Sequence, residues 1–420
     1  MIIALLVYPY LKNSTRIFKT IGKMSTPEEL AETLQDVDID SHPHRFKADE
    51  LDIQVDLFDP NSTLYSVTKF EELNIQADIL KGIYACKFIK PSKIQENALP
   101  LLLTEPYRNL IAQSQSGTGK TAAFTICCLS RVDRTLPEPQ AVILAPAREL
   151  AKQIKQVIDE IGQFTGIQVE AAVREEMESE GISTAQIIVG TPGTILHWIK
   201  TKRLNTNNIK VMVLDEADNM LQGQSMSQQA IRIKNMLMRN RPQICLFSAT
   251  YPNSVREFAL QFAPDANRIT LQEEELKVDA IKQFYIEISD FANHHRDIFP
   301  EYHPRISNEV KNKLLEDIYG LLTVGQSIIF VQTKRTADEV TAKMTQEGHS
   351  CAVLHGGLSP NERDQIMEEF REGKAKVLIA TNVLSRGIDV IGVNLVINYD
   401  LPVMRLDDEY VPDFETYGIC

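Results

Sequence analysis

The chain of 420 residues has few cysteines, no long apolar stretch and no excess of positive charge. The six cysteines show no metal-ligand spacing, so no zinc module is predicted, and thiols such as the adjacent Cys127 and Cys128 are expected to be buried and reduced. No run reaches the roughly eighteen apolar residues that a membrane-spanning helix requires. Residues 1–7 are apolar, but no basic residue precedes them, so no signal peptide is predicted.

The net charge of −13 by itself argues against a nucleic-acid partner. The charge is uneven, because residues 28–59 hold eleven Asp/Glu and only two Lys/Arg, which leaves the rest near neutral. We interpret residues 1–69 as an acidic, mostly flexible extension, with a short helix starting at Thr26-Pro27-Glu28-Glu29, and a specific regulatory role is the alternative. Residues 1–23 are interpreted as an added extension or a gene-model error, since Met24-Ser25 resembles a natural start.

One stretch carries more information than any other, Ala112-Gln-Ser-Gln-Ser-Gly-Thr-Gly-Lys-Thr121. It follows a short apolar run and precedes a helix-like run, which together indicate a phosphate-binding loop between a strand and a helix. Its glycines allow the backbone to approach phosphates closely, its lysine reaches the outer phosphates, and its final threonine can bind Mg²⁺. The predicted nucleotide-binding residues of the loop are Ser116, Gly117, Thr118, Gly119, Lys120 and Thr121.

Two further apolar runs end in residues that suit phosphate chemistry. Lys210-Val-Met-Val-Leu214 reads as a buried strand and leads into Asp215-Glu216-Ala217-Asp218. We assign Asp215 to Mg²⁺ and Glu216 to the base that activates water. The run Gln243–Phe247 leads into Ser248-Ala249-Thr250, and these hydroxyl groups are expected to hydrogen-bond carboxylates such as Asp218.

Together these residues resemble the DEAD-box RNA helicases over about residues 60–417, with the motifs in family order. The resemblance implies that Gln95 in Phe88-Ile-Lys-Pro-Ser-Lys-Ile-Gln95 reads adenine, that Phe88 belongs to the same motif and that Phe70 stacks on the base. The family usually has glycine where this chain has Lys87. Within the family, the Asp59–Val67 and Ile94–Pro100 segments and Asn382 are most similar to the nuclear-pore mRNA-export helicases.

The resemblance also implies RNA contacts, mostly to phosphate and 2′-hydroxyl groups. In the first half these fall on Pro146, Arg148, Thr191, Pro192 and Gly193, and in the second half on Gly356, Arg363 and Thr381. Gly387 and Asp389 would face ATP. The implied partners are RNA, a nuclear-pore docking protein and an activator that depends on inositol hexakisphosphate, with a cytoplasmic and nuclear location.

The alternation of apolar strand-like and helix-like runs predicts an α/β fold with two RecA-like parallel-sheet domains in tandem. Domain boundaries are expected at 70–271 for the ATP-binding domain, 272–280 for a linker and 281–420 for the second domain. Expected strands lie at 141–144, 186–189, 211–214 and 244–247, then at 281–288, 327–331, 351–354, 377–380 and 395–398. Polar residues 290–307 are interpreted as a surface-loop insertion.

The resemblance departs from the family at the end, where the arginine-rich motif expected after Glu415-Thr-Tyr417 is missing and the second domain is interpreted as truncated. Loss of an arginine finger costs roughly 10³–10⁵ in rate. Two hypotheses therefore compete, an ATP-dependent RNA helicase and a catalytically impaired ATP-binding and partner-binding fragment. A DNA translocase fits less well, since the Gln95 motif and the Asp215-Glu-Ala-Asp218 run belong with RNA in the resembled family. A G protein fits less well still, since no Asn-Lys-x-Asp run is present.

Overall fold

The computed structural model describes residues 2–6, 22–24, 26, 29, 53–59, 66–114, 117–173, 181–222, 224–271, 283–294, 307–322, 324–381, 390, 392–400, 403–406 and 409–412. These residues form two compact units. Domain 1 comprises residues 45–277, and domain 2 comprises residues 1–44 together with 278–420. The expected linker, 272–280, lies outside the described residues. Within them, no helix is long and apolar enough to cross a membrane.

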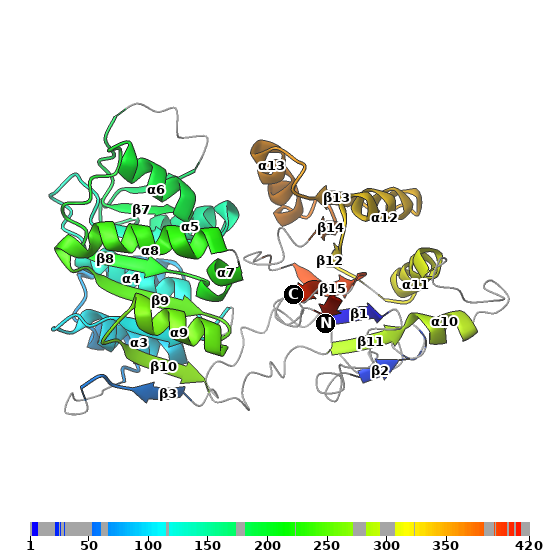
Figure 1. Ribbon diagram of the computed structural model, residues 1–420, viewed down its shortest axis with the longest axis horizontal. Helices are drawn as coiled ribbons and strands as arrows, with labels where there is room; N and C mark the ends of the chain where they lie inside the picture. The colour runs from blue at the N-terminus through cyan, green and yellow to red at the C-terminus, as the bar shows by residue number, and fades with distance from the viewer. Residues whose placement is uncertain are drawn as a thin grey trace. The chain divides into compact units, whose positions relative to one another are not determined.

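Domain 1 is built around an eight-stranded sheet with the order β3-β10-β4-β9-β8-β5-β7-β6 (Figure 1). All pairs are parallel except β3 with β10. Its strands are β3 (Ile53–Asp56), β4 (Leu110–Gln113), β5 (Ala141–Leu144), β6 (Val169–Ala172), β7 (Ile187–Gly190), β8 (Val211–Leu214), β9 (Gln243–Ser248) and β10 (Asn267–Leu271).

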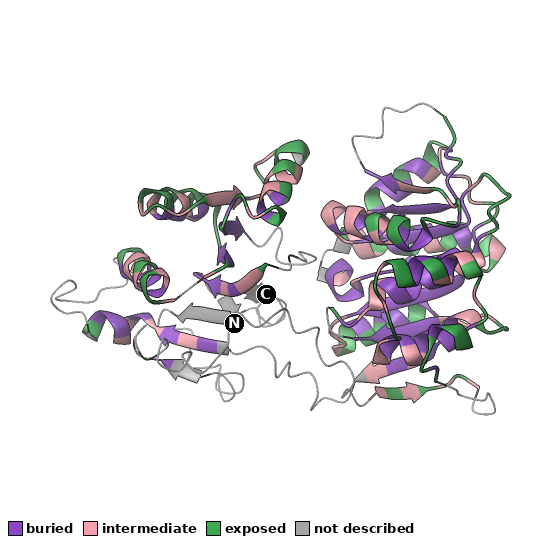
Figure 2. Ribbon diagram, turned by 180° about the vertical axis from the view of Figure 1, so that it is seen from behind, coloured by how far each residue is buried: buried purple, intermediate pink, exposed green. Residues whose placement is uncertain are grey.

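Helices cover both faces of this sheet, and its inner strands β4, β5, β7, β8 and β9 are buried along their length (Figure 2). This burial explains why β4, β5, β7 and β8 are short, continuous apolar runs. The helices are α2 (Ala77–Ala85), α3 (Lys93–Leu103), α4 (Lys120–Arg131), α5 (Arg148–Gly162), α6 (Pro192–Lys200), α7 (Ala217–Gln222), α8 (Gln224–Leu237) and α9 (Asn253–Phe262), with short 3₁₀ turns η3 (Phe70–Glu72) and η5 (Met238–Asn240).

Domain 2 contains a seven-stranded, all-parallel sheet with the order β13-β14-β12-β15-β1-β11-β2. Its strands are β1 (Ile2–Leu6), β2 (Gly22–Met24), β11 (Gln283–Glu287), β12 (Gln326–Val331), β13 (Cys351–Leu354), β14 (Val377–Thr381) and β15 (Val393–Asn398). Its helices are α10 (Ile288–His294), α11 (Ser307–Leu321), α12 (Lys334–Gln346) and α13 (Pro360–Arg371). A separate hairpin pairs β16 (Val403–Leu406) with β17 (Glu409–Pro412).

The nine strands expected from the sequence are confirmed to within two residues at most ends. The N-terminal region differs from the expectation of a mostly flexible extension, because β1 and β2 join the sheet of domain 2 and β3 joins that of domain 1. The expected helix start is visible in one contact, since the Glu29 backbone N–H donates to the Thr26 hydroxyl at 3.3 Å. The loop expected at 290–307 is wrong for residues 290–294, which belong to α10, and residues 295–306, before α11 begins at Ser307, lie outside the described residues.

Candidate nucleotide and RNA site

The phosphate-binding loop connects β4 to α4, and its glycines have left-handed backbone angles. Gly117 has φ +77° and Gly119 has φ +101°, a region that residues with a Cβ rarely enter. A Cβ at Gly119 would also lie 2.5 Å from Nε2 of Gln95. Position 119 therefore requires glycine, because its backbone angle is left-handed and because a side chain there would collide with Gln95. Thr118 is buried and its hydroxyl lies 2.5 Å from that of Ser114, whereas Ser116 lies outside the described residues.

The amino group of Lys120 is held inside this loop. Its Nζ donates to the backbone carbonyl of Ser114 at 2.5 Å. Burial lowers the pKa of Lys120, while the nearby charges of Asp215, Asp218 and Glu216 act in the opposite direction. The buried amino group is therefore held between the loop backbone and three nearby carboxylates.

Asp215 and Glu216 follow β8 at the same edge of the sheet as the loop. Asp215 is 4% exposed and its Oδ1 accepts the Glu216 backbone N–H at 3.0 Å. Burial raises the pKa of Asp215, and Lys120 opposes this shift. The buried Asp215 carboxylate and the Lys120 amino group therefore influence each other's charge at this edge of the sheet.

Glu216 combines an unusual backbone with an unusual acidity. Its φ of +48° is uncommon for a residue with a Cβ and is a form of strain found at functional sites. Burial first, and the neighbouring Asp215 second, raise the pKa of Glu216 to about 7. The Asn219 amide donates to Oε2 of Glu216 at 2.6 Å and counteracts part of this rise. A carboxylate that titrates near neutrality is well matched to accepting a proton from water.

The expected hydrogen bond between a hydroxyl group after β9 and the Asp218 carboxylate is confirmed for Thr250, whereas the Ser248 hydroxyl contacts the Asp218 backbone. Oδ2 of Asp218 accepts the backbone N–H and the hydroxyl of Thr250 at 3.1 and 2.9 Å. The Asp218 N–H donates to the Ser248 hydroxyl at 3.3 Å, which itself donates to the Thr250 carbonyl at 2.7 Å. Because the Ser114 N–H also donates to the Ser248 carbonyl at 3.0 Å, β9 joins the carboxylate turn to the phosphate loop.

Gln95 connects the proposed adenine-reading segment to the phosphate loop. Its Nε2 donates to the Gly119 carbonyl and its Oε1 accepts the Ser92 N–H, both at 3.0 Å. Each amide atom keeps capacity for one further hydrogen bond, so these contacts leave room for a base edge. Phe88 is half-buried against the core, whereas Phe70 is 1% exposed and packs edge-on against Tyr84 at 6.5 Å. The Phe70 ring is therefore not open to a base in this structure.

The expected RNA-contacting residues of domain 1 lie at the ends of two neighbouring strands. Arg148 begins α5 after β5, and Thr191 precedes α6 after β7. The two turns touch, because the Ala145 N–H donates to the Gly190 carbonyl at 3.0 Å. Both helix N-termini consequently offer positive ends at one place, a ready site for phosphates. The associated residues are Pro146 before Arg148 and Pro192 and Gly193 in the first turn of α6.

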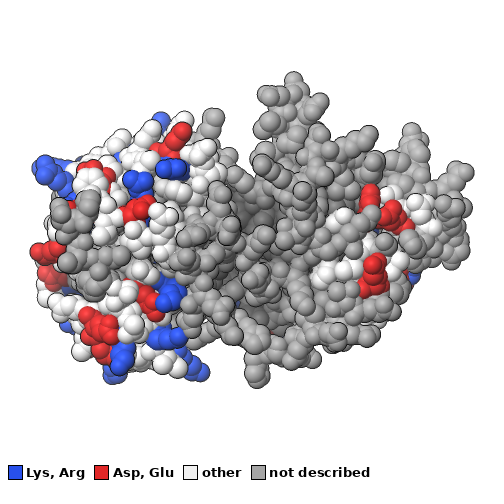
Figure 3. Space-filling view, turned by 90° about the horizontal axis from the view of Figure 1, so that it is seen from below, with Lys and Arg blue, Asp and Glu red and all other residues white. Residues whose placement is uncertain are grey.

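The order of strands separates nucleotide residues from RNA residues along one edge of the sheet. From β4 through β9 and β8, the carboxyl ends hold the phosphate loop, Ser248 and Asp215, and the next strands, β5 and β7, hold the RNA candidates. Ligands of open parallel sheets bind at this edge. In the view of Figure 3, acidic and basic side chains are interspersed over the described surface of domain 1, so neither sign dominates that face.

The candidate residues of domain 2 also gather at strand ends. Gly356 follows β13, Arg363 lies in the first turns of α13, and Thr381 ends β14, beside β13 in the sheet. Thr381 is 6% exposed. Gly387 and Asp389 lie outside the described residues.

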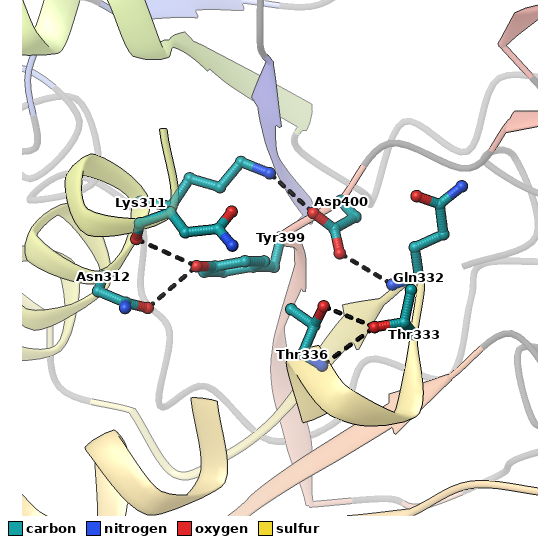
Figure 4. A network of polar contacts seen from close by, with 8 residues as sticks. Lys311, Asn312, Gln332, Thr333, Thr336, Tyr399 and Asp400 are labelled. Atoms are coloured by element: carbon teal, nitrogen blue, oxygen red, sulfur yellow. Dashed lines mark hydrogen bonds and ion pairs between the residues drawn. The ribbon is translucent and has the colours of Figure 1, made fainter. Parts of the chain in front are cut away.

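Asp400, which the motif search missed, organises this end of domain 2 (Figure 4). Its Oδ1 pairs with the buried Lys311 amino group of α11 at 2.7 Å, and its Oδ2 accepts the Gln332 backbone N–H at 2.9 Å. Gln332 directly precedes Thr333, whose hydroxyl accepts the Thr336 N–H and so caps α12. Asp400 therefore fixes the start of α12 to β15 and α11.

Simple sequence signals existed for both residues that were missed. Asn219 stands three positions after Glu216, the spacing that brings side chains together on one helix face. Asp400 follows an apolar strand, as Asp215 does. The signal for Asn219 is weak, because amides at this spacing are common on helices without any catalytic role.

Comparison with known proteins identifies the family. The family models "DEAD/DEAH box helicase" and "Helicase conserved C-terminal domain" match residues 92–258 and 310–413. The chain is 51% identical over 359 residues to "ATP-dependent RNA helicase DBP5" of Debaryomyces hansenii, covering 86% of this chain and 69% of the relative.

Solved structures agree with this assignment. Saccharomyces cerevisiae Dbp5 bound to RNA and ADP BeF3 matches with a TM-score of 0.74 and 47% identity, over 84% of this chain and 85% of that one. A Dbp5 variant from the same yeast, bound to Nup159, a Gle1 variant, IP6 and ADP, matches with a TM-score of 0.54 and 41% identity, over 82% and 84%. The chain belongs to the DEAD-box RNA helicases, in the Dbp5 group that acts in mRNA export.

Proposed function

We propose that this protein is an ATP-dependent RNA helicase, an RNA-stimulated ATPase that remodels RNA or RNA–protein complexes in mRNA export. The arrangement of Lys120, Asp215 and Glu216 at one sheet edge carries this proposal. It places a phosphate-binding cation, a buried carboxylate and a proton acceptor around one position. The 51% identity with a relative named as an ATP-dependent RNA helicase supports the same activity.

The nucleotide is proposed to be ATP, read through Gln95. In its present contacts the Gln95 amide touches the Gly119 carbonyl, so recognition of the base and the shape of the phosphate loop depend on the same side chain. Lys120 would exchange the Ser114 carbonyl for a phosphate oxygen, and the negative charge of phosphate favours the protonated lysine. Glu216 would take the proton of the attacking water. Phe70 would need to leave the core to stack on adenine.

Mg²⁺ is proposed to bind through the Asp215 carboxylate and the Thr121 hydroxyl, completed by phosphate and water. No cluster of three or more His, Cys, Asp or Glu side chains able to hold a metal occurs among the described residues. This donor set fits Mg²⁺, which at nucleotide sites takes one or two protein oxygens rather than an all-protein cage. When bound, the ion would offset the charge that develops on the phosphates.

RNA is proposed to bind along the helix N-termini that follow β5 and β7, with Arg148 contributing charge and Thr191 a hydroxyl group. Domain 2 would add Gly356, Arg363 and Thr381. Such contacts address the backbone of a single strand, so little sequence preference is expected.

The partners and location follow from the Dbp5 relatives. The yeast structure holds Nup159, Gle1 and IP6 together with ADP. We infer that this chain docks on a nuclear-pore protein like Nup159. We also infer an activator like Gle1, which depends on inositol hexakisphosphate. A nuclear-pore location, with cytoplasmic and nuclear pools, is the corresponding proposal.

Nucleotide binding and turnover of the 420-residue chain, measured with and without single-stranded RNA, test the proposal. Binding is followed with a fluorescent ATP analogue and turnover by phosphate release. Lys120→Ala should abolish binding, whereas Glu216→Gln should bind and turn over much more slowly. Lys155→Ala, a lysine on the outer side of α5 paired to Asp159, serves as the matched control. Binding without RNA-stimulated turnover would support the impaired-fragment alternative, and micromolar binding by Lys120→Ala would refute the phosphate-loop assignment.

A further inference from the structure

Domain 2 contains a shielded ion pair, Lys311–Asp400, at the start of α12 (Figure 4). The two side chains are 6% and 18% exposed, and their charged atoms lie 2.7 Å apart. The Lys311 amino group also lies over the ring of the buried Tyr399, 4.8 Å from its centroid. Because a shielded ion pair adds little stability compared with an apolar pair of the same size, its place in the fold is the more informative property.

The second oxygen of Asp400 holds the turn from which α12 begins. Its Oδ2 accepts the Gln332 backbone N–H at 2.9 Å. The next residue, Thr333, caps the helix by accepting the Thr336 N–H at 3.1 Å. The cap uses the N–H of Thr336, and the N–H groups of the two residues before it have no intrahelical partner. The first turn of α12 therefore presents free donors and a partial positive charge, which suit a phosphate group.

The start of α12 lies beside a buried hydroxyl group that has no partner. Val331, the last residue of β12, stands opposite Thr381 in the sheet. Thr381 alternates with Ile379, whose core cluster also holds the buried residues of α12, so both lie on the face that α12 covers. The Thr381 hydroxyl is buried and has no hydrogen-bond partner among the described residues. On the other side, Nζ of Lys334 lies 3.0 Å from the place that a Cβ of Gly357 would take. Donors, a free hydroxyl and an amino group thus surround one place at this edge of domain 2.

The charge of Asp400 conflicts with a phosphate at this place unless another charge offsets it. The carboxylate contacts the residue directly before the Thr333 cap, so it lies close to the first turn of α12. Charges repel each other over about 10 Å at 0.1 M salt, so an unpaired carboxylate here would weaken phosphate binding. The Lys311 amino group, in contact with the other carboxylate oxygen, supplies the opposite charge.

We propose that Asp400 and Lys311 are positioning residues for RNA. Asp400 holds the start of α12 in place beside Thr381, and Lys311 cancels the charge that would repel the phosphate bound there. The inference rests on the proposed function, because the phosphate is taken to belong to a single RNA strand. Neither residue touches the phosphate, which contacts the first turn of α12 and the Thr381 hydroxyl. The site therefore needs an oxygen at position 400 but not its charge, and it needs Lys311 only while that charge is present.

RNA binding by the full chain tests the role of the charge. A fluorescently labelled oligouridylate is titrated in the presence of a non-hydrolysable ATP analogue, under conditions in which circular dichroism shows the variants folded. Lys311→Met should weaken RNA binding at least about ten-fold at low salt, and this defect should shrink at about 0.5 M salt, where charges are screened. A merely structural defect would not depend on salt in this way. Lys313→Met is the matched control, since it removes the same charge from the same helix, where Lys313 pairs with Asp317, and it should change RNA affinity by less than about three-fold.

Two double variants test the role of the oxygen and do not depend on folding of Lys311→Met. Both Lys311→Met/Asp400→Asn and Lys311→Met/Asp400→Leu remove the ion pair and leave no buried charge, so both should fold. The asparagine variant keeps an oxygen for the Gln332 N–H and should bind RNA within about three-fold of the parent. The leucine variant has nearly the same shape but no acceptor, so it should bind at least about ten-fold more weakly. Binding of a fluorescent ATP analogue without RNA should be unchanged in every variant.

The outcomes separate this inference from the proposed function. If the parent binds RNA and the two double variants bind it equally, the positioning role of Asp400 is overturned while the helicase proposal stands. A folded Lys311→Met variant with the affinity of the parent, or with a defect that salt does not reduce, would overturn the role of Lys311 in the same way. A parent chain that binds the ATP analogue but no RNA would overturn both the RNA part of the proposed function and this inference.

Discussion

Replacing Glu216 by glutamine should stabilise domain 1 at alkaline pH when nucleotide and metal are absent. The pKa of Glu216 rises from an ordinary 4.5 to about 7 because the carboxyl is buried beside Asp215. The folded state therefore binds this proton more tightly than the unfolded state, and stability falls as the pH rises from 4.5 towards 7. A displacement of this size corresponds to roughly 3 kcal/mol in full. Glutamine has nearly the same shape, carries no charge and keeps an oxygen for the Asn219 amide.

The single tryptophan of the chain makes the measurement specific to domain 1. Trp198 is fully buried in α6, so its fluorescence during urea unfolding reports on that domain alone. In EDTA at pH 8.5, Glu216→Gln should unfold with a free energy about 3 kcal/mol above that of the parent, and at pH 4.0 the difference should nearly vanish. Both values avoid the isoelectric point near 5.2.

The reasoning has a matched control and a clear contradiction. Glu257→Gln, an exposed position on α9, should show no such difference. If the two proteins differ in unfolding free energy at pH 4.0 as much as at pH 8.5, the effect comes from packing rather than ionisation. If they do not differ at pH 8.5, the raised pKa of Glu216 is refuted. Asn219→Ala removes the hydrogen bond that lowers the pKa of Glu216. At pH 8.5 this substitution should therefore destabilise the parent protein more than it destabilises the Glu216→Gln variant.

Three further changes test other parts of the structure. Lys87→Gly should stabilise domain 1 by about 0.5–1 kcal/mol by the same fluorescence signal, because the lysine has φ +62°; a loss of stability would contradict the strain. Lys311→Met should lower the free energy of unfolding of domain 2 by about 3 kcal/mol, because it leaves the Asp400 carboxylate without its buried partner. The measurement is the circular-dichroism unfolding transition of domain 2, and an unchanged transition would show that solvent replaces the lysine. Gly119→Ala should weaken binding of the fluorescent ATP analogue at least about ten-fold, since the new Cβ meets Gln95, and unaltered affinity would show that the loop relaxes without cost.

Sequence patterns located the strands and most of the candidate site because those signals are local. A buried parallel strand must be a short apolar run, and the candidate residues come soon after it, since Asp215 directly follows β8 and the loop after β4 leads to Lys120. The glycine usual in the family at position 87 has a structural reason, since the backbone there is left-handed.

Other features depend on parts of the chain that meet only in the fold. The pKa of Glu216 comes from burial and the charge of Asp215, and the Gln95 contact with Gly119 joins segments 24 residues apart. β1 pairs with β11, which lies more than 270 residues later in the chain. From the sequence alone, the apolar run that forms β1 was interpreted as part of an added extension. The sequence determined which short segments form the sheets and which are candidates for binding phosphate, because hydrophobic period and motif spacing are properties of neighbouring residues. Tertiary structure alone decided which strand pairs with β11 and β15 and which carboxylate has a pKa near neutrality, because pairing and desolvation depend on distant residues.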